Sequence, residues 1–424
     1  MPTALMNTGF EHGLHSVSGQ GLFNALTGTA PTIATDQIRN GAYSLKCALP
    51  TSAYQSSNRP PIWAASSRLV FRFGFRYSGN PSVQIVIAEM SAGGIFPRIV
   101  LTTNGELRAA TSGGTPSDGS VISITPNAWH LVEWVVDMNQ TAYRHRIKVD
   151  GTENATDATA TGSGAGSVVQ FNIGVTGSVT LSVARDLWFD DLIVGSTATA
   201  LTGGVAFTDY WGDGKGIWII PGSDGTHSFT ANDFSTGDAG TLRAPSYTDF
   251  WQMVDDPAPW VTARSTTDNI TQRVIRNTGY VEIKPATTAL TGETANAVRA
   301  FMAYSSTAAT ANTAACIIRN STPVSTTIWG THTGIGGGSD ALTDHSEVTN
   351  FFKSAIVTPP AAGWTKSEIE ALRWRVGAAG DISPVPTWQF LALEVDYPII
   401  SAPAENPLRR KFIRNEAAHR ASRW

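Results

Sequence analysis

The sequence predicts an all-β protein built from two tandem antiparallel β-sandwich (jelly-roll) domains, with one short helix near residues 365–374. Apolar residues make up 42% of the chain, enough for a substantial core, and charged residues only 15%, against ~25% in a typical globular chain. Gly is plentiful, at 40 residues, and lies with Thr, Ser and Ala between short apolar runs. Runs of this kind, bounded by turn residues, are typical of strands rather than of helical bundles.

The first half of the chain contains a series of predicted strands. Residues 68–77 (RLVFRFGFRY) alternate, with the apolar side chains on one face and Arg72 and Arg76 on the other, which predicts a half-buried strand with one wet face. Residues 98–111 are a predicted hairpin with Asn104-Gly105 as a type I′ turn. The remaining strand predictions in this half are 82–90, 129–138 paired with 143–151 (ending at Asp150-Gly151), 168–175 and 187–194.

At 424 residues the chain is long enough for two domains. We assign residues 1–195 to the first β-sandwich and residues 205–400 to the second. The stretch between them, 196–204 (STATALTGG), is small, polar and Gly-rich, as expected of a linker. Residues 401–424 form a basic C-terminal tail.

The segment 363–374 (GWTKSEIEALRW) carries the one helix signal. Thr365 and Glu368 match a T-x-x-E capping box. Ile369, Leu372 and Val376 follow at helical spacing. We expect a helix of about two turns that covers one end of the second sandwich.

Charge and cysteine content exclude several classes of protein. The net charge is −4, and the last twenty residues carry six Arg or Lys against two Glu, so the rest of the chain is mildly acidic and has no nucleic-acid footprint. Cys47 and Cys316 lie far apart and are expected to be buried free thiols. The first residues lack the pattern of a signal peptide, and no apolar run approaches the ~18 residues of a membrane span.

Four phrases of the first half together resemble the concanavalin A-like lectin/glucanase superfamily, in particular its laminin-G-type jelly rolls. In order, they are GFEHG (9–13), NGAYSLKC (40–47), NAWHLVEWVVD (127–137) answered by RIKVDG (146–151), and LWFDDLIV (187–194). The resemblance covers about residues 7–195 and implies a jelly roll in which the FDD strand completes a sheet.

The second half resembles proteins encoded in the structural gene clusters of tailed bacteriophages. The phrases are PGSDGT (221–226), a W-x-x-V-D-D element that begins at Trp251, and PPAAGWTKSEIEALRWRVG (359–377). This resemblance implies a minor tail or particle-surface component of the virion, made in the cytoplasm of a bacterial host. It implies other virion proteins as partners, and virion symmetry favours a homo-oligomer.

The adjacent Asp190 and Asp191 are the first candidates for chemistry. In a regular strand they face opposite ways, so they cannot converge on one ion or one substrate atom without a bulge. The pattern favours one Asp that faces solvent and one that binds a neighbouring turn or Arg. A Ca²⁺ site needs ~6–8 oxygens, and the sequence has no DxDxDG loop. A role for one of them as a metal ligand, with loop carbonyls, stays open.

Glycosidase chemistry is weakly supported. Enzymes of the resembled superfamily carry E-x-D-x-x-E on one strand, with two carboxylates on one face. The closest match, Glu394-Val-Asp396, lacks the second Glu, and Glu133 and Asp137 share a face but lie four residues apart. We predict no catalytic residue, no cofactor and no zinc site, and expect the chain not to be an enzyme; polysaccharide degradation is the weakest alternative.

Aromatic residues in turn-rich stretches are candidates for stacking on sugar rings: Trp63, Tyr210, Trp211, Trp251 and Trp260. Packing in the core or at an interface is the alternative, which we favour, because aromatic residues are common in both. A carbohydrate-binding adhesin that recognises a host-surface glycan is therefore the second functional hypothesis.

The basic tail is a candidate anchor to the particle. Apolar side chains are interleaved with charged ones over Arg409, Arg410, Lys411, Phe412 and Arg414. Charge runs are usually solvated. A segment that orders on docking to an acidic neighbouring subunit fits the pattern equally well.

Overall fold

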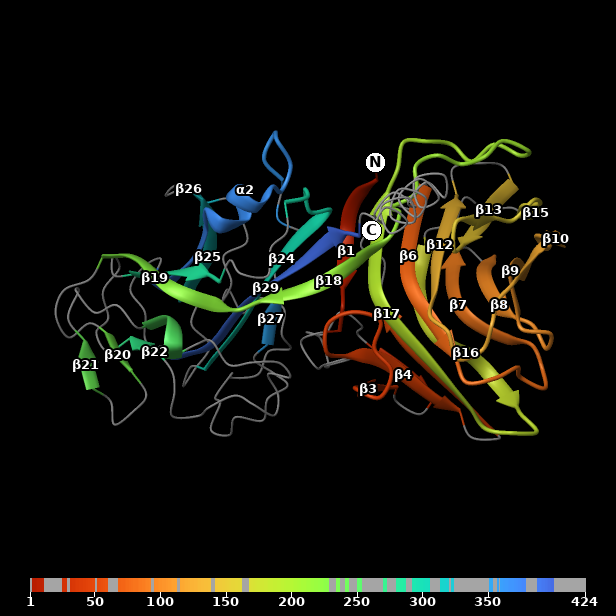
Figure 1. Cartoon of the computed structure of the whole chain (residues 1–424), viewed down its shortest axis with the longest axis horizontal. Helices are drawn as coiled ribbons and strands as arrows, with labels where there is room; N and C mark the ends of the chain where they lie inside the picture. Colours follow the sequence, from red (N-terminus) through yellow and green to blue (C-terminus); the bar gives the residue numbers. More distant parts are fainter. Residues whose placement is uncertain are drawn as a thin grey trace, which may run out of the picture.

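Strands dominate the computed structural model of the chain, and they form four antiparallel sheets (Figure 1). The all-β prediction is confirmed. The structure describes residues 2–10, 25–28, 31–49, 52–59, 68–92, 95–112, 115–138, 142–161, 168–228, 234–236, 241–243, 250–253, 270–272, 280–286, 292–305, 313–319, 322–323, 351–353, 357, 359–378 and 387–399.

The first two sheets face each other and form the first sandwich. The ten strands of one sheet are β1 (Thr3–Thr8), β3 (Thr32–Ala34), β4 (Ser44–Leu49), β6 (Arg68–Tyr77), β10 (Thr115–Ser117), β12 (His130–Asp137), β13 (Ala142–Val149), β14 (Thr152–Glu153), β15 (Ala158–Thr161) and β17 (Arg185–Ser196). The seven strands of the other are β2 (Ala25–Gly28), β5 (Ser52–Arg59), β7 (Ile85–Ala92), β8 (Phe96–Leu101), β9 (Glu106–Ser112), β11 (Val121–Ser123) and β16 (Val168–Thr180). In space the ten-stranded sheet runs β10-β15-β13-β12-β6-β17-β4-β3, with β1 on β17 and β14 on β13.

The core of the first sandwich follows the alternation of the sequence. Phe71 of β6 stacks on Trp134 of β12 and also meets Phe171 of the opposite sheet, each at a centroid separation of 4.9 Å. Aromatic rings at this spacing bury much apolar area and hold the two sheets together. Cys47 is a buried free thiol in this core, as predicted, whereas the side chain of Cys316 lies outside the described part of the chain.

The remaining two sheets form a second pair with its own core. One consists of β18 (Gly214–Ile219), β20 (Phe234–Thr236), β21 (Thr241–Arg243), β22 (Ile270–Gln272), β24 (Ala297–Ser305), β27 (Phe351–Lys353) and β29 (Thr387–Pro398). The other consists of β19 (Pro221–Ser228), β23 (Tyr280–Pro285), β25 (Thr313–Arg319), β26 (Thr322–Pro323) and β28 (Leu372–Ala378). Val298 of β24 and Leu393 of β29 pack with Ile283 of β23 and Trp374 of β28.

Two hairpin turns test the sequence predictions, and one of them differs from its predicted type. Asp150 and Gly151 both have positive φ (49° and 85°), which is the type I′ geometry between β13 and β14. The hairpin β8–β9 is also present, but its predicted turn type is wrong. Gly105 has φ 74° whereas Asn104 does not have positive φ, and the Gly105 N–H donates to the Thr102 carbonyl at 3.2 Å. This is a type I turn followed by a left-handed glycine.

The helix is shorter than predicted. α2 (Lys366–Glu370) begins after Thr365, whose hydroxyl accepts a hydrogen bond from the Glu368 N–H, so the predicted cap is confirmed. Leu372 and Val376 belong to β28 instead of the helix. From Leu372 onward alternate side chains are buried, and pairing with β23 and β25 overrides the helical spacing. Ile369 is buried in the second core. A short 3-10 helix, η2 (Phe250–Met253), lies against β19.

Candidate functional site at the interface of the sandwiches

The outer face of the ten-stranded sheet is covered by later parts of the chain. β1 contacts β24 and β29, and β17 contacts β18, so the two sandwiches meet along these strands (Figure 1). Arg72, which the alternation placed on a wet face, is fully buried there. The prediction of a wet face is wrong at this position because the second sandwich covers it.

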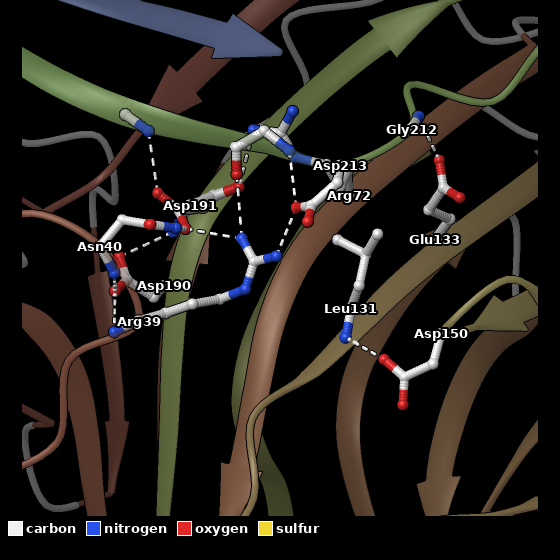
Figure 2. Close-up of polar contacts among 12 residues, drawn as sticks. Arg39, Asn40, Arg72, Leu131, Glu133, Asp150, Asp190, Asp191, Gly212 and Asp213 are labelled. Carbon is white, nitrogen blue, oxygen red and sulfur yellow. Dashed lines mark hydrogen bonds and ion pairs between the residues drawn. The ribbon is translucent and has the colours of Figure 1, made fainter. Parts of the chain in front are cut away.

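The predicted opposite orientation of Asp190 and Asp191 is also wrong. The pairing of β17 with β6 shifts register between Asp190 and Ile193, and Asp191 has φ 50°. This is the bulge that a regular strand lacks, and it turns both carboxylates toward residues 39–40 (Figure 2). Neither aspartate faces solvent, since both side chains are buried.

Asp190 anchors a loop of its own sandwich. Its Oδ2 accepts hydrogen bonds from the backbone N–H groups of Arg39 at 2.9 Å and Asn40 at 3.3 Å, and its Oδ1 accepts one from Asp191 at 2.8 Å. Burial raises the pKa of Asp190 well above its ordinary value, and the neighbouring Asp191 raises it further. Asp190 therefore fixes residues 39–40 against β17.

Asp191 links the two sandwiches. Its Oδ2 accepts hydrogen bonds from Arg39 Nη1 at 2.8 Å and Asn40 Nδ2 at 2.6 Å, and its Oδ1 accepts one from the Gly216 N–H of β18 at 2.8 Å. The Arg39 guanidinium also binds the Asp213 carboxylate and the Gly214 carbonyl (Figure 2). One carboxylate and one guanidinium thus fasten the start of β18 to the first sandwich.

These contacts do not fit a cation site. All four carboxylate oxygens of Asp190 and Asp191 face N–H donors, and one of the donors is a guanidinium. Within the described residues, no group of three or more His, Cys, Asp or Glu side chains is placed to hold a metal ion. The pair serves as an anchor.

A buried ion pair joins β6 to β29. Arg72 forms a salt bridge with Asp396, and both side chains are almost completely buried. Arg72 also donates to the Asp191 carbonyl at 3.3 Å, and Asn296 Nδ2 donates to Asp396 Oδ1 at 2.7 Å. A Cβ at Gly214 would overlap the Arg72 guanidinium, so glycine is required for this close approach.

Glu394, two residues before Asp396, contacts the end of β1. Its Oε1 accepts a hydrogen bond from the Gly9 N–H at 2.7 Å. Burial raises the pKa of Glu394 to about 7, although Arg299 and the Gly9 N–H favour the ionised form. We call Arg39, Arg72, Asp190, Asp191, Asp213, Arg299, Glu394 and Asp396 the interface cluster.

Glu133 and Asp137 share a face of β12, as predicted, and both anchor the segment that connects the sandwiches (residues 197–213). Glu133 accepts from the Gly212 N–H at 2.7 Å and lies 3.3 Å from Lys148 Nζ. Asp137 accepts from the Leu201 N–H at 3.0 Å and pairs with Arg68 at 2.9 Å. The connecting segment, which extends past the predicted linker 196–204, is thus tied to the sheet at Leu201 and at Gly212.

Two of the five predicted sugar-stacking residues lie in this connecting segment. Trp211 is 9% exposed, packs with Val70 and donates its Nε1–H to the Val70 carbonyl at 3.0 Å. Tyr210 donates its hydroxyl to Glu153 at 2.9 Å, and Lys148 lies over its ring. Both aromatics pack against the sheet, which is the alternative that the sequence favoured.

The other predicted site residues are not described. Trp63 and Trp260 lie outside the described residues, as do Arg409, Arg410, Lys411, Phe412 and Arg414. Trp251 belongs to η2, but its side chain is not described. Glycan binding and docking through the tail stay predictions.

Sequence reasoning missed Arg39, Arg299 and the role of Arg72. One signal was available: Gly74 lies in the middle of the strand 68–77, and an isolated glycine in a strand often marks a close approach. A Cβ at Gly74 would lie 2.5 Å from Arg39 Cδ and 3.4 Å from the Trp129 ring. The glycine thus marks the place where Arg39 crosses the sheet.

Comparisons with known proteins do not identify a family. No family model matches the sequence, and no curated protein is similar to it. Solved structures with a weak similarity to this chain include a sialidase (14% identity, 46% of this chain, 19% of the sialidase, TM-score 0.32) and a carbohydrate esterase of a Shiga toxin-encoding bacteriophage (12% identity, 41% of this chain, 91% of the esterase, TM-score 0.30). A structure of botulinum neurotoxin type C, which interacts with two ganglioside molecules, matches 62% of this chain and 80% of its own at 10% identity and a TM-score of 0.32.

These comparisons correct one expectation. The chain was expected not to be an enzyme, but the similar structures include sialidases and a carbohydrate esterase, which contradicts that expectation. The chain spans only 19% of the first sialidase and 26% of a Trypanosoma rangeli sialidase. At TM-scores near 0.3 the similarities assign neither a reaction nor a ligand to this chain.

No helix in the described part of the chain has the length and apolar character needed to cross a membrane.

Proposed function

We propose that this chain is a structural component of a tailed-bacteriophage particle, in the tail or on the particle surface, and that it acts through assembly contacts. The observation that carries the proposal is the buried interface cluster. The Arg72–Asp396 ion pair and the Asp191–Gly216 hydrogen bond join strands of different sandwiches in the interior. A chain held in this way can act as a rigid two-part unit, as a particle component requires.

The sequence supports the same proposal. The segment 359–377 carries the resemblance to phage structural proteins, and within it the structure has a capped helix followed by a core strand. We infer that the basic residues of 405–424 dock on an acidic neighbouring subunit. We also infer that the protein assembles as a homo-oligomer within the particle.

The test is particle incorporation. In the phage whose genome encodes this sequence, the protein should be found by mass spectrometry of purified particles and placed by immunogold labelling. A variant that lacks residues 405–424 should fold normally yet be absent from the particles. A second variant keeps the full length of the tail but removes positive charge from it. In this variant Gln replaces Arg409, Arg410, Lys411 and Arg414.

Two results would overturn the proposal. Absence of the full-length protein from purified particles would refute the virion role itself. Normal incorporation of the variant without residues 405–424 would refute only the anchor. Arg108→Gln, which removes a partly exposed basic side chain of β9, is the control and should be incorporated normally.

Binding of a host-surface glycan is a second candidate, carried by the 13 tryptophans of the chain. A glycan array compares the wild type with Trp251→Ala, which should lose binding if this residue stacks on a sugar ring. Trp211→Ala is the matched control, because Trp211 packs against the sheet and its loss should affect stability. Absence of binding to every host-surface glycan on the array would refute the hypothesis.

A further inference from the structure

The interface cluster contains more acids than bases. Its five carboxylates are Asp190, Asp191, Asp213, Glu394 and Asp396, and its three guanidinium groups are Arg39, Arg72 and Arg299. Ionisation of all five carboxylates would leave two negative charges uncompensated within the cluster. Since uncompensated charge in a buried site is costly, the cluster must hold protons or weaken. Asp190, which accepts only from backbone N–H groups and has a pKa well above its ordinary value, is one site for a proton, and Glu394 is the candidate for the other.

Hydrogen-bond geometry indicates where a proton resides. Glu394 is fully buried, and its Oε2 has no hydrogen-bond partner among the described residues. The carboxamide of Asn7, on the neighbouring β1, is likewise buried and has no partner within the described part of the chain. A bare carboxylate oxygen in such a place is unfavourable, whereas a protonated carboxyl group removes the charge.

The groups that face Glu394 come from several strands. Arg299 of β24 pairs across from it, and Thr8 and the Gly9 N–H approach from the first sandwich. Asp396, on the same strand, is held by Arg72 of β6 and adds negative charge beside Glu394, and Asp191 of β17 adds negative charge beside Asp396. On β18, Trp218 is the residue paired with Glu394, and Lys215 is paired with Tyr397 of β29.

We propose that Glu394 is a proton-controlled lock between the two sandwiches, closed when its carboxyl group is protonated and loosened when the group ionises. The lock acts on the contact of β29 with the end of β1. Ionisation places a second carboxylate beside that of Asp396, and Arg72 and Asn296 already bind Asp396. This inference does not depend on the proposed function.

The direction in which the opening equilibrium changes with pH follows from its linkage to proton binding by Glu394. The pKa of Glu394 is about 7 in the closed state and 4.5 for the free group, so the closed state binds the proton more tightly. The lock is complete below pH 4.5, and it weakens as the pH rises to 7. These two values predict an opening equilibrium about fiftyfold larger at pH 7.5 than at pH 5.

Hydrogen exchange of the full-length protein tests the lock. The readout is the protection factor of the Gly9 and Gly216 amides, which are hydrogen-bonded across the interface, at pH 5 and pH 7.5. Wild-type protection should fall about fiftyfold, because these amides exchange when the sandwiches separate. Glu394→Gln keeps the acceptor for Gly9 but cannot ionise, so its protection should fall far less between the two pH values than that of the wild type.

A matched control and a second measurement keep the test decisive. Glu89→Gln removes a largely buried carboxylate that pairs with Arg98 on the other sheet, and it should behave as the wild type does. A fall of less than fivefold in the wild type, or the same fall in Glu394→Gln, would overturn the proposal. If Glu394→Gln does not fold, a carboxyl ¹³C titration of the wild type decides, and a Glu394 midpoint below pH 5.5 would reject the lock.

Discussion

Arg72→Met is the most informative substitution at the interface. It removes the cation of the Arg72–Asp396 pair and keeps much of the side-chain volume, while Asp396 stays 1% exposed with Asn296 as its remaining neutral donor. Breaking a buried ion pair from one side costs about 3–5 kcal/mol, because the other charge is left uncompensated. Since domains are stable by about 5–15 kcal/mol, the loss would be a large part of the total.

The assay is equilibrium urea denaturation of the full chain at pH 7.5, followed by tryptophan fluorescence and circular dichroism. The double variant Arg72→Met/Asp396→Asn removes both charges and should recover most of the loss, with a coupling energy of about 2–3 kcal/mol. Arg108→Met is the control, because Arg108 and Asp118 form a partly exposed pair at 3.1 Å that should contribute less than about 1 kcal/mol. If Arg72→Met costs no more than Arg108→Met, the ion pair does not hold the sandwiches together.

Three further substitutions test other parts of the structure. Gly214→Ala should destabilise the chain by about 1–3 kcal/mol in the same assay, because its Cβ would lie 2.7 Å from the Tyr397 carbonyl oxygen. The control is Gly292→Ala, whose Cβ would meet no atom within 4 Å and which should leave the stability unchanged. Thr365→Ala should cost about 1 kcal/mol through loss of the helix cap, and no change in the denaturation midpoint would contradict that role. Burial alone would lower the pKa of His130, but Asp150 and the Thr125 carbonyl raise it, so this contact stabilises the fold at acid pH and is lost as the pH rises through the elevated pKa. His130→Asn should therefore lower Tm more at pH 5.5 than at pH 9, and an equal shift at both would refute this.

Local sequence patterns predicted much of the first sandwich. Alternation placed the apolar side chains of residues 68–77 on one face, where Phe71 lies in the core, and Asp150-Gly151 forms the predicted turn. Alternation reports only which residues share a face, and it does not report what covers that face. Arg72 therefore looked solvent-exposed, because its partner Asp396 lies 324 residues away in the chain.

The predicted length of the short helix was wrong for a related reason. Ile369 and Leu372 fit helical spacing, but Leu372 begins a strand that pairs with β23 and β25. The cap at Thr365 depends on neighbours three residues apart and was predicted correctly. Where the helix ends depends on strand partners from distant sequence, so the local signal could locate its start and not its end.

Asp191 shows why the candidate site could not be predicted from the strand pattern. A non-glycine residue at φ 50° is strained by about 1–3 kcal/mol and persists only where its surroundings fix it. The surroundings here are Arg39, Asn40 and Gly216, two from a distant loop and one from the second sandwich. The bulge that gathers the acids therefore depends on contacts that are distant in sequence: Arg39 and Asn40 hold it within the first sandwich, and Gly216 adds a hydrogen bond that exists only when the two sandwiches are in contact.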